Sequence, residues 1–110
     1  MDKRKAQRLK AAGWAVGDAG DFLELTDEER AFIETKLALA AAVRERRKRR
    51  KLSQTQLARR LGSSQSRVAK MEAADPTVSL DLLVRSLLNL GATQADIAKA
   101  IRKGVSRSAA

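Results

Sequence analysis

The sequence LSQTQLARRLGSSQSRVAKME, residues 52–72, determines the fold expected for this chain. Ser53 with a glutamine three residues later is a capping box, which predicts a helix over residues 54–61. Gly62 ends that helix, because glycine readily takes the left-handed conformation of a helix end. A serine two residues later caps a second helix over residues 65–73. The stretch therefore predicts two short helices that meet at a tight turn.

The second helix has two chemically different faces. Val68 and Met71 are apolar and are expected to pack inward. Polar side chains occupy its first turn and outer face: Gln65, Ser66, Arg67 and Lys70. The first turns of a helix in the major groove of B-DNA approach the base edges, where Gln pairs with adenine and Arg or Lys with guanine. We expect these four residues to contact bases, although the same two faces also occur in ordinary soluble helices.

Directly upstream, residues 44–51 contain seven Lys or Arg residues and one acid, Glu45. The segment supplies more than half of the chain's net charge of +10. Such a charge indicates a polyanionic partner, either nucleic acid or an anionic membrane surface. A solvated helix face is the alternative, but beside the two-helix motif the run favours phosphate contacts. The expected phosphate contacts in this run are Arg46, Lys48, Arg49 and Lys51. Ser64, at the start of the second motif helix, is a further one.

Composition excludes several classes of function. The 110 residues support one domain with a modest core, and they include no Cys and no His. Disulfides, the usual metal sites and His- or Cys-dependent nucleophiles are thereby excluded, so we expect no enzyme, no metal and no cofactor. No apolar run approaches the ~18 residues of a membrane span, and the N-terminus lacks a signal-peptide core, which favours a cytoplasmic location without membrane contact. Few aromatic residues argue against single-strand recognition.

The rest of the chain also has helical texture. Thr26 opens a capping box for a helix that reaches about Arg50, and its apolar residues share one face: Phe32, Ile33, Leu37, Ala40, Ala41 and Val43. Ser79 caps a helix over residues 80–90, whose inward positions are Leu80, Leu83, Val84, Leu87 and Leu88. Thr93 with Asp96 opens a last helix through about Arg102, before a tail without apolar periodicity. The fold class is therefore all-α.

The stretch 52–72 closely resembles the helix-turn-helix of lambda-repressor-like regulators, also called Cro-type or XRE-type. Matching residues are Leu52-Ser53-Gln54, Leu57-Ala58, Leu61-Gly62, Ser64-Gln65-Ser66-Arg67-Val68 and Met71-Glu72. The starts and ends of the following helix, Ser79-Leu80 and Leu90-Gly91, match as well. The resemblance covers about residues 36–100 and implies a five-helix DNA-binding domain.

The resemblance also implies roles for single residues. Gln54 would hold a phosphate, and Arg47 would pair with Glu72. Ala58 is small enough for the two helices to cross closely, and Gly62 takes the tight geometry of the turn. Family members often have Asn-Gly after the glutamate, where this chain has Ala73-Ala74. Because alanine resists the left-handed conformation, we expect the second helix to run a turn longer or to lack a Schellman motif.

These features predict an N-terminal helical extension (1–35), a DNA-binding domain (36–102) and a flexible tail (103–110). The expected function is that of a transcriptional regulator that binds double-stranded DNA as a homodimer on a palindromic operator, more often a repressor in this family. Because the extension resembles that of some HigA-type antitoxins, an alternative is an antitoxin that binds a protein toxin and represses its own operon. Another is a membrane or acidic-protein binder that uses the basic helix.

Overall fold

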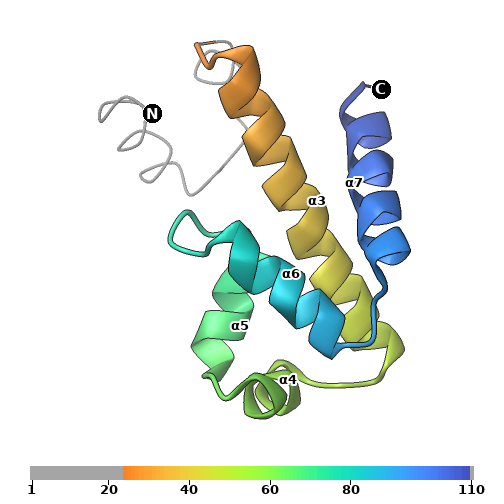
Figure 1. Ribbon diagram of the computed structural model, residues 1–110. Helices are drawn as coiled ribbons and strands as arrows, with labels where there is room; N and C mark the ends of the chain where they lie inside the picture. Colours follow the sequence, from red (N-terminus) through yellow and green to blue (C-terminus); the bar gives the residue numbers. More distant parts are fainter. Residues whose placement is uncertain (1–23, 110) are drawn as a thin grey trace.

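Figure 1 shows the computed structural model, which describes residues 24–109 and side chains through residue 104. The described residues form five helices and no strand: α3 (Asp27–Arg49), α4 (Gln54–Leu61), α5 (Gln65–Glu72), α6 (Leu80–Asn89) and α7 (Gln94–Ala109). The prediction of an all-α fold is confirmed. α7 runs alongside the long helix α3, and α5 lies on the opposite side of α3 (Figure 1).

Each helix begins at a serine or threonine whose hydroxyl oxygen accepts a hydrogen bond from the backbone N–H three residues later. The five distances are 3.0–3.2 Å, at Thr26, Ser53, Ser64, Ser79 and Thr93. At three of them the later side chain, Glu29, Gln56 or Asp96, accepts in return from the backbone N–H of the cap residue. A cap of this kind stabilises a helix by about 1 kcal/mol, so local hydrogen bonds fix where these helices start.

Four helices end in Schellman motifs with a residue of positive φ. Gly62 and Gly91 take this conformation at φ +64° and +89°, as expected of glycine. Lys51 and Ala74 take it at φ +57° and +55°, although they carry a Cβ. In each motif the next residue donates its N–H to a carbonyl five residues back, at 2.8–3.1 Å. Local hydrogen bonding therefore also fixes the helix ends.

The end of α5 corrects a prediction. We expected this helix to run a turn longer or to lack a Schellman motif, but it stops at Glu72 and the motif is present. The N–H of Asp75 donates to the carbonyl of Lys70 at 3.0 Å, and Ala74 supplies the left-handed residue. Ala74 is 2% exposed, so burial of its methyl group offsets the unfavourable conformation.

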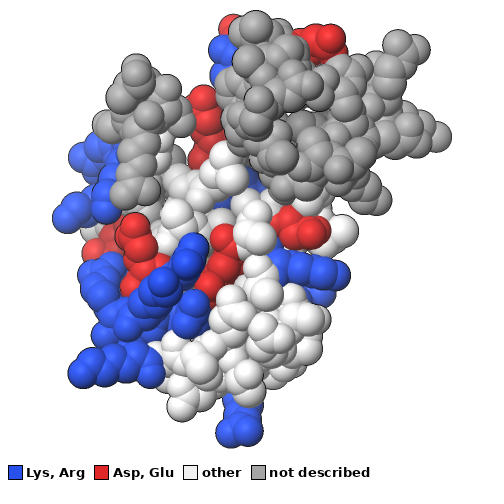
Figure 2. All heavy atoms as spheres, turned by 180° about the vertical axis from the view of Figure 1, so that it is seen from behind, with Lys and Arg blue, Asp and Glu red and all other residues white. Residues whose placement is uncertain are grey.

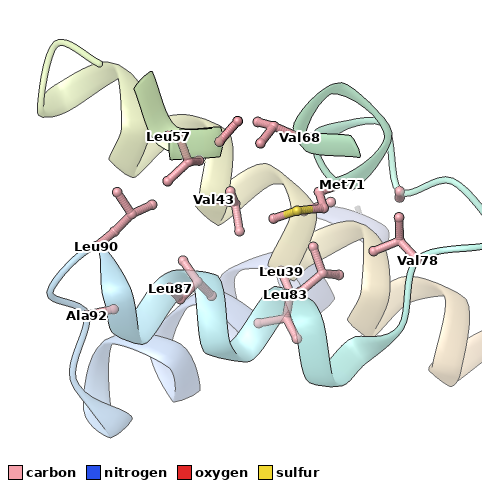
Figure 3. Packing of buried hydrophobic residues seen from close by; sticks show 13 residues of the cluster. Leu39, Val43, Leu57, Val68, Met71, Val78, Leu83, Leu87, Leu90 and Ala92 are labelled. Atoms are coloured by element: carbon pink, nitrogen blue, oxygen red, sulfur yellow. The ribbon is translucent and has the colours of Figure 1, made fainter. Parts of the chain in front are cut away.

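The core lies where α4, α5 and α6 meet one face of α3. Leu57 of α4 and Val68 and Met71 of α5 point toward Val43 of α3 and Leu87 of α6 (Figure 3). All five side chains are 0–2% exposed. Burial of a side chain of this size contributes about 1.5–3 kcal/mol, so this cluster holds the two short helices against the scaffold.

Two predicted core residues face solvent. Phe32 of α3 is 43% exposed and Leu88 of α6 is 48% exposed. Lys36 and Ser86 are buried on the same helices instead. Ser86 satisfies its hydroxyl by donating to the carbonyl of Leu82 at 2.7 Å. In α6 the apolar periodicity misses this position because a helix-internal hydrogen bond lets a serine occupy the core. In α3, Lys36 Nζ donates to the carbonyl of Pro76 at 3.4 Å.

α7 ends later than predicted. The sequence indicated an end near Arg102, but the helix continues to Ala109. Gly104 is a packing residue of this helix, because a Cβ built on it would lie 2.4 Å from the Cβ of Ala38 on α3. Trp14 and Phe22 of the predicted extension lie outside the described residues, and the domain boundaries given above remain predictions.

Candidate nucleic-acid interface

α5 presents a polar edge on a helix whose other side is anchored in the core. Val68 and Met71 are both 0% exposed. The four residues predicted to contact bases, Gln65, Ser66, Arg67 and Lys70, are all exposed. Because the helix is only eight residues long, its buried side fixes the direction in which the polar edge faces.

The turn between α4 and α5 sets the relative position of the two helices. The N–H of Ser63 donates to the carbonyl of Ala58 at 2.8 Å across the left-handed Gly62. Ala58 itself is 3% exposed. A small residue at this place lets neighbouring helices approach closely, as the sequence predicts. The geometry is that of a helix-turn-helix pair.

A chain of hydrogen bonds joins the interior of the domain to the first residue of α5. Arg47 holds Glu72 with two bonds, Nε to Oε2 at 2.6 Å and Nη2 to Oε1 at 2.9 Å. Gln54 Nε2 donates to Glu72 Oε1 at 3.2 Å, and Gln65 Nε2 donates to Gln54 Oε1 at 2.7 Å. The structure thus brings together four of the predicted site residues from α3, α4 and α5.

The ion pair at the inner end of this chain is shielded from water. The side chains of Arg47 and Glu72 are 11% and 5% exposed. Arg47 Nη1 also donates to the carbonyl of Leu52 at 2.8 Å. Hydrogen bonding to Glu72 raises the pKa of Arg47, against the opposing effect of burial. The pair implied by the family resemblance is present, and it links the end of α3 to the end of α5.

The carboxylate of Glu72 fixes which groups donate and which accept in this series of hydrogen bonds. A carboxylate only accepts hydrogen bonds, so the Gln54 amide must turn its NH2 group toward Glu72. The Gln54 carbonyl oxygen then faces Gln65, whose NH2 group donates to it. Gln65 is left with its own Oε1 and one N–H for a ligand. The interior of the protein therefore determines which hydrogen-bonding groups the exposed amide presents.

A family model described as Helix-turn-helix matches residues 43–85. Over these residues the chain is similar to the helix-turn-helix domains of that family. Helix-turn-helix domains are DNA-binding modules of transcriptional regulators, and α5 corresponds to the second helix of the motif. The match confirms the resemblance to lambda-repressor-like regulators. No curated protein and no solved structure matches the chain.

The basic run next to the helix-turn-helix motif is divided among several tasks. Arg50 Nη1 donates to the carbonyl of Leu90 at 2.8 Å and so caps the end of α6. Arg46 pairs with Asp96 of α7 at 3.3 Å, which ties it to α7 and not to the motif. Lys48 and Arg49 line a groove between α3 and α7. Lys51, two residues before the cap of α4, is exposed.

Lys and Arg side chains gather on the side of the molecule where the C-terminal half of α3 lies beside α7 (Figure 2). Sequence reasoning missed two features of this region. The sequence assigned the cations of α3 to phosphate contacts, but it did not show that Lys99 and Lys103 of α7 lie across a groove from them. It also missed the bond between Gln54 and Gln65. The available signal was a pair of glutamines at the first positions of consecutive helices in one motif.

Two properties of the described residues bear on other functions. No helix there is both long and apolar enough to span a bilayer. In the same residues, no group of three or more Asp or Glu side chains is placed to hold a metal ion.

Proposed function

We propose that the helix-turn-helix domain reads specific sequences in double-stranded DNA, with the polar edge of α5 in the major groove. The observation that carries this proposal is the hydrogen-bond chain from Arg47 to Gln65. It orients an exposed amide on the helix that the fold presents outward. Sequence reading benefits from such preorganisation, because fewer rotamers are lost when the duplex binds.

Gln65 is suited to adenine. Its remaining Oε1 accepts and its remaining N–H donates, which complements the N6 amino group and the N7 acceptor of adenine in the major groove. Arg67 and Lys70 carry the donors that guanine O6 and N7 accept. Ser66 is small enough to let the helix approach the base edges. We therefore propose these four residues as the base contacts.

Phosphates would be held beside this edge. One N–H of the Gln54 amide is left over after the bond to Glu72 and is available to a phosphate oxygen. Ser64, at the start of α5, and Lys51, before α4, are exposed and are proposed as further phosphate contacts. Such contacts position the protein, while the base contacts specify the sequence.

We further propose that the protein acts as a homodimer and represses transcription by occupying an operator. Two domains related by a two-fold axis would read half-sites about 34 Å apart, one turn of B-DNA. An antitoxin is the second candidate. The family match begins at residue 43, so the first 16 residues of α3 lie N-terminal to it and include the exposed Phe32. That segment favours a second protein-binding surface such as a toxin would need.

The proposal is tested by selecting bound sites from a random duplex pool and then measuring Gln65→Ala on the selected site. We expect the substitution to weaken binding by about 1–3 kcal/mol on the selected site and by much less on random duplex. Arg85→Ala is the matched control, because Arg85 is an exposed cation of α6 paired with Asp81. A selected motif with two-fold symmetry would support the dimer.

Two results would overturn this function. Equal losses on selected and random duplex would show that Gln65 does not read sequence. Absence of binding to every duplex at low salt would remove the DNA-binding function itself, since the electrostatic part of the affinity is strongest there.

A further inference from the structure

A groove of about 560 Å³ lies between α3 and α7, away from the contact between α4 and α5. Its α3 wall carries Arg46, Lys48 and Arg49, and its α7 wall carries Lys99 and Lys103. Two acids, Glu45 and Asp96, are the other charged residues of the lining. The lining therefore has an excess of positive charge on both sides of the groove.

The two acids of the lining already have cationic neighbours within it. Arg46 Nη2 lies 3.3 Å from Asp96 Oδ2, and Lys103 Nζ lies 4.0 Å from Glu45 Oε2. No ion pair within 4.0 Å holds Lys48, Arg49 or Lys99 in the described part of the chain. Three cations of the rim are thus available to an anionic ligand.

The floor of the groove is apolar. Ala42, Leu87, Ala92, Ile97 and Ala100 supply it. No aromatic side chain of the described residues lines the groove, so they offer nucleic acid bases no stacking surface there. Phosphate and sugar groups placed on this apolar floor would lose their own hydration without gaining hydrogen bonds in return. A ligand that fills the groove must combine negative charges at its edges with apolar groups at its centre.

We propose that this groove docks an acidic amphipathic segment of a partner protein. The available cations lie on both walls, Lys48 and Arg49 on α3 and Lys99 on α7, so they complement acids on the two flanks of an amphipathic helix. The apolar residues of the partner would lie on the alanine and isoleucine floor, in a helix-in-groove arrangement. The inference goes beyond DNA binding, because it uses α7 residues that have no part in the proposed reading edge.

The test uses the full chain and a fluorescent synthetic peptide of about 14 residues, or roughly four helical turns, with Leu along one face and Glu on both flanks of that face. A peptide of the same charge without Leu is the control ligand. Fluorescence anisotropy should show that the amphipathic peptide binds and that the control peptide binds at least about tenfold more weakly. Equal binding of the two peptides would overturn the proposal, as would failure of both to bind.

Three variants locate the binding. Lys99→Glu should weaken peptide binding about fivefold or more, while Arg85→Glu, the same charge change on α6, should leave it within about twofold. Ala100→Lys should also weaken binding, because it obstructs the floor, although it adds a positive charge. Tighter binding by Ala100→Lys, or an equal loss in Arg85→Glu, would show non-specific attraction and overturn the proposal.

The same variants are titrated with a random-sequence duplex. Lys99→Glu should leave duplex affinity within about twofold at moderate salt. A loss of duplex affinity as large as the loss of peptide affinity would assign the groove to nucleic acid and overturn the proposal. This readout separates the groove from the helix-turn-helix, since failure of duplex binding by the parent chain leaves the peptide result intact.

Discussion

At the scale of single residues, the polar edge of α5, proposed above to read DNA, depends on a carboxylate behind it. Glu72 is held by Arg47, and its charge sets the direction of the two amides that follow. The ion pair itself was inferred from a family resemblance and not from spacing, because a basic run places some Arg near some Glu in many folds. The orientation of Gln65 requires coordinates, since the sequence does not show which amide groups meet.

The left-handed Lys51 is a residue-scale test of helix-end strain. Lys51→Gly should stabilise the protein by about 1 kcal/mol, because glycine takes φ +57° without a Cβ penalty. Ala74→Gly, at almost the same φ, should give little net gain, since it removes a buried methyl group. Urea unfolding measures both variants. Equal stabilisation by the two changes would show that burial of Ala74 contributes nothing.

At the scale of helices, the sequence predicted starts better than ends. All five starts were predicted, because a Ser or Thr cap and its partner lie within four residues of one another. The predicted end of α5 was wrong because burial of Ala74 in the core offsets its unfavourable left-handed conformation. The predicted end of α7 was wrong because Gly104 packs against α3. Both errors arise from tertiary contacts that a local pattern does not contain.

Because α7 lies so close to α3, a Gly-to-Ala change in α7 is predicted to lower the stability of the protein, where such a change usually raises it. At an open helix position such a change stabilises by about 1 kcal/mol. Gly104→Ala should instead destabilise by about 1–3 kcal/mol, because the new Cβ would lie 2.4 Å from that of Ala38. Thermal unfolding measures the effect. The same change made in an Ala38→Gly background should be less harmful, and a raised Tm in the parent background would contradict the close approach.

The start of α7 predicts that the stability of the protein falls at acidic pH. Hydrogen bonds from Thr93 lower the pKa of Asp96 below its ordinary value of 3.8, and Arg46 and Lys99 lower it further. A lowered folded-state pKa stabilises the protein above pH 3.8, and this contribution is lost as pH falls through the lower folded value. Urea unfolding from about pH 5 to pH 2 should show less acid sensitivity in Asp96→Asn than in Asp81→Asn. Identical slopes in the two variants would contradict this assignment.

At the scale of the whole molecule, the positive charge serves more than one surface. The sequence assigned Arg46, Lys48, Arg49 and Lys51 to one phosphate-binding surface. The structure divides them, because Arg46 pairs with α7 and two others line the groove there. A helix places successive residues about 100° apart, so a continuous basic run necessarily faces several directions. Which direction serves DNA depends on where α5 packs.

This division predicts different salt dependences for two lysines. Lys51→Ala should flatten the plot of log binding constant against log salt by about 0.9 for one lost phosphate contact. Lys48→Ala, a matched change in the groove, should leave the slope for duplex binding unchanged. Anisotropy titrations with one duplex at several salt concentrations measure both slopes. A flattened slope for Lys48→Ala would return that residue to the DNA surface.

The hydrogen-bond chain also bears on how such a regulator diverges. Gln65 takes its orientation from Gln54, and Gln54 from Glu72. Under the proposed function, a mutation at Glu72 would therefore alter the base that the Gln65 amide prefers. Operator preference would then drift through substitutions at Glu72 or Arg47, which contact no nucleotide in the proposed complex. A comparison of paralogues restricted to the exposed edge of the helix would overlook that source of new regulatory circuits.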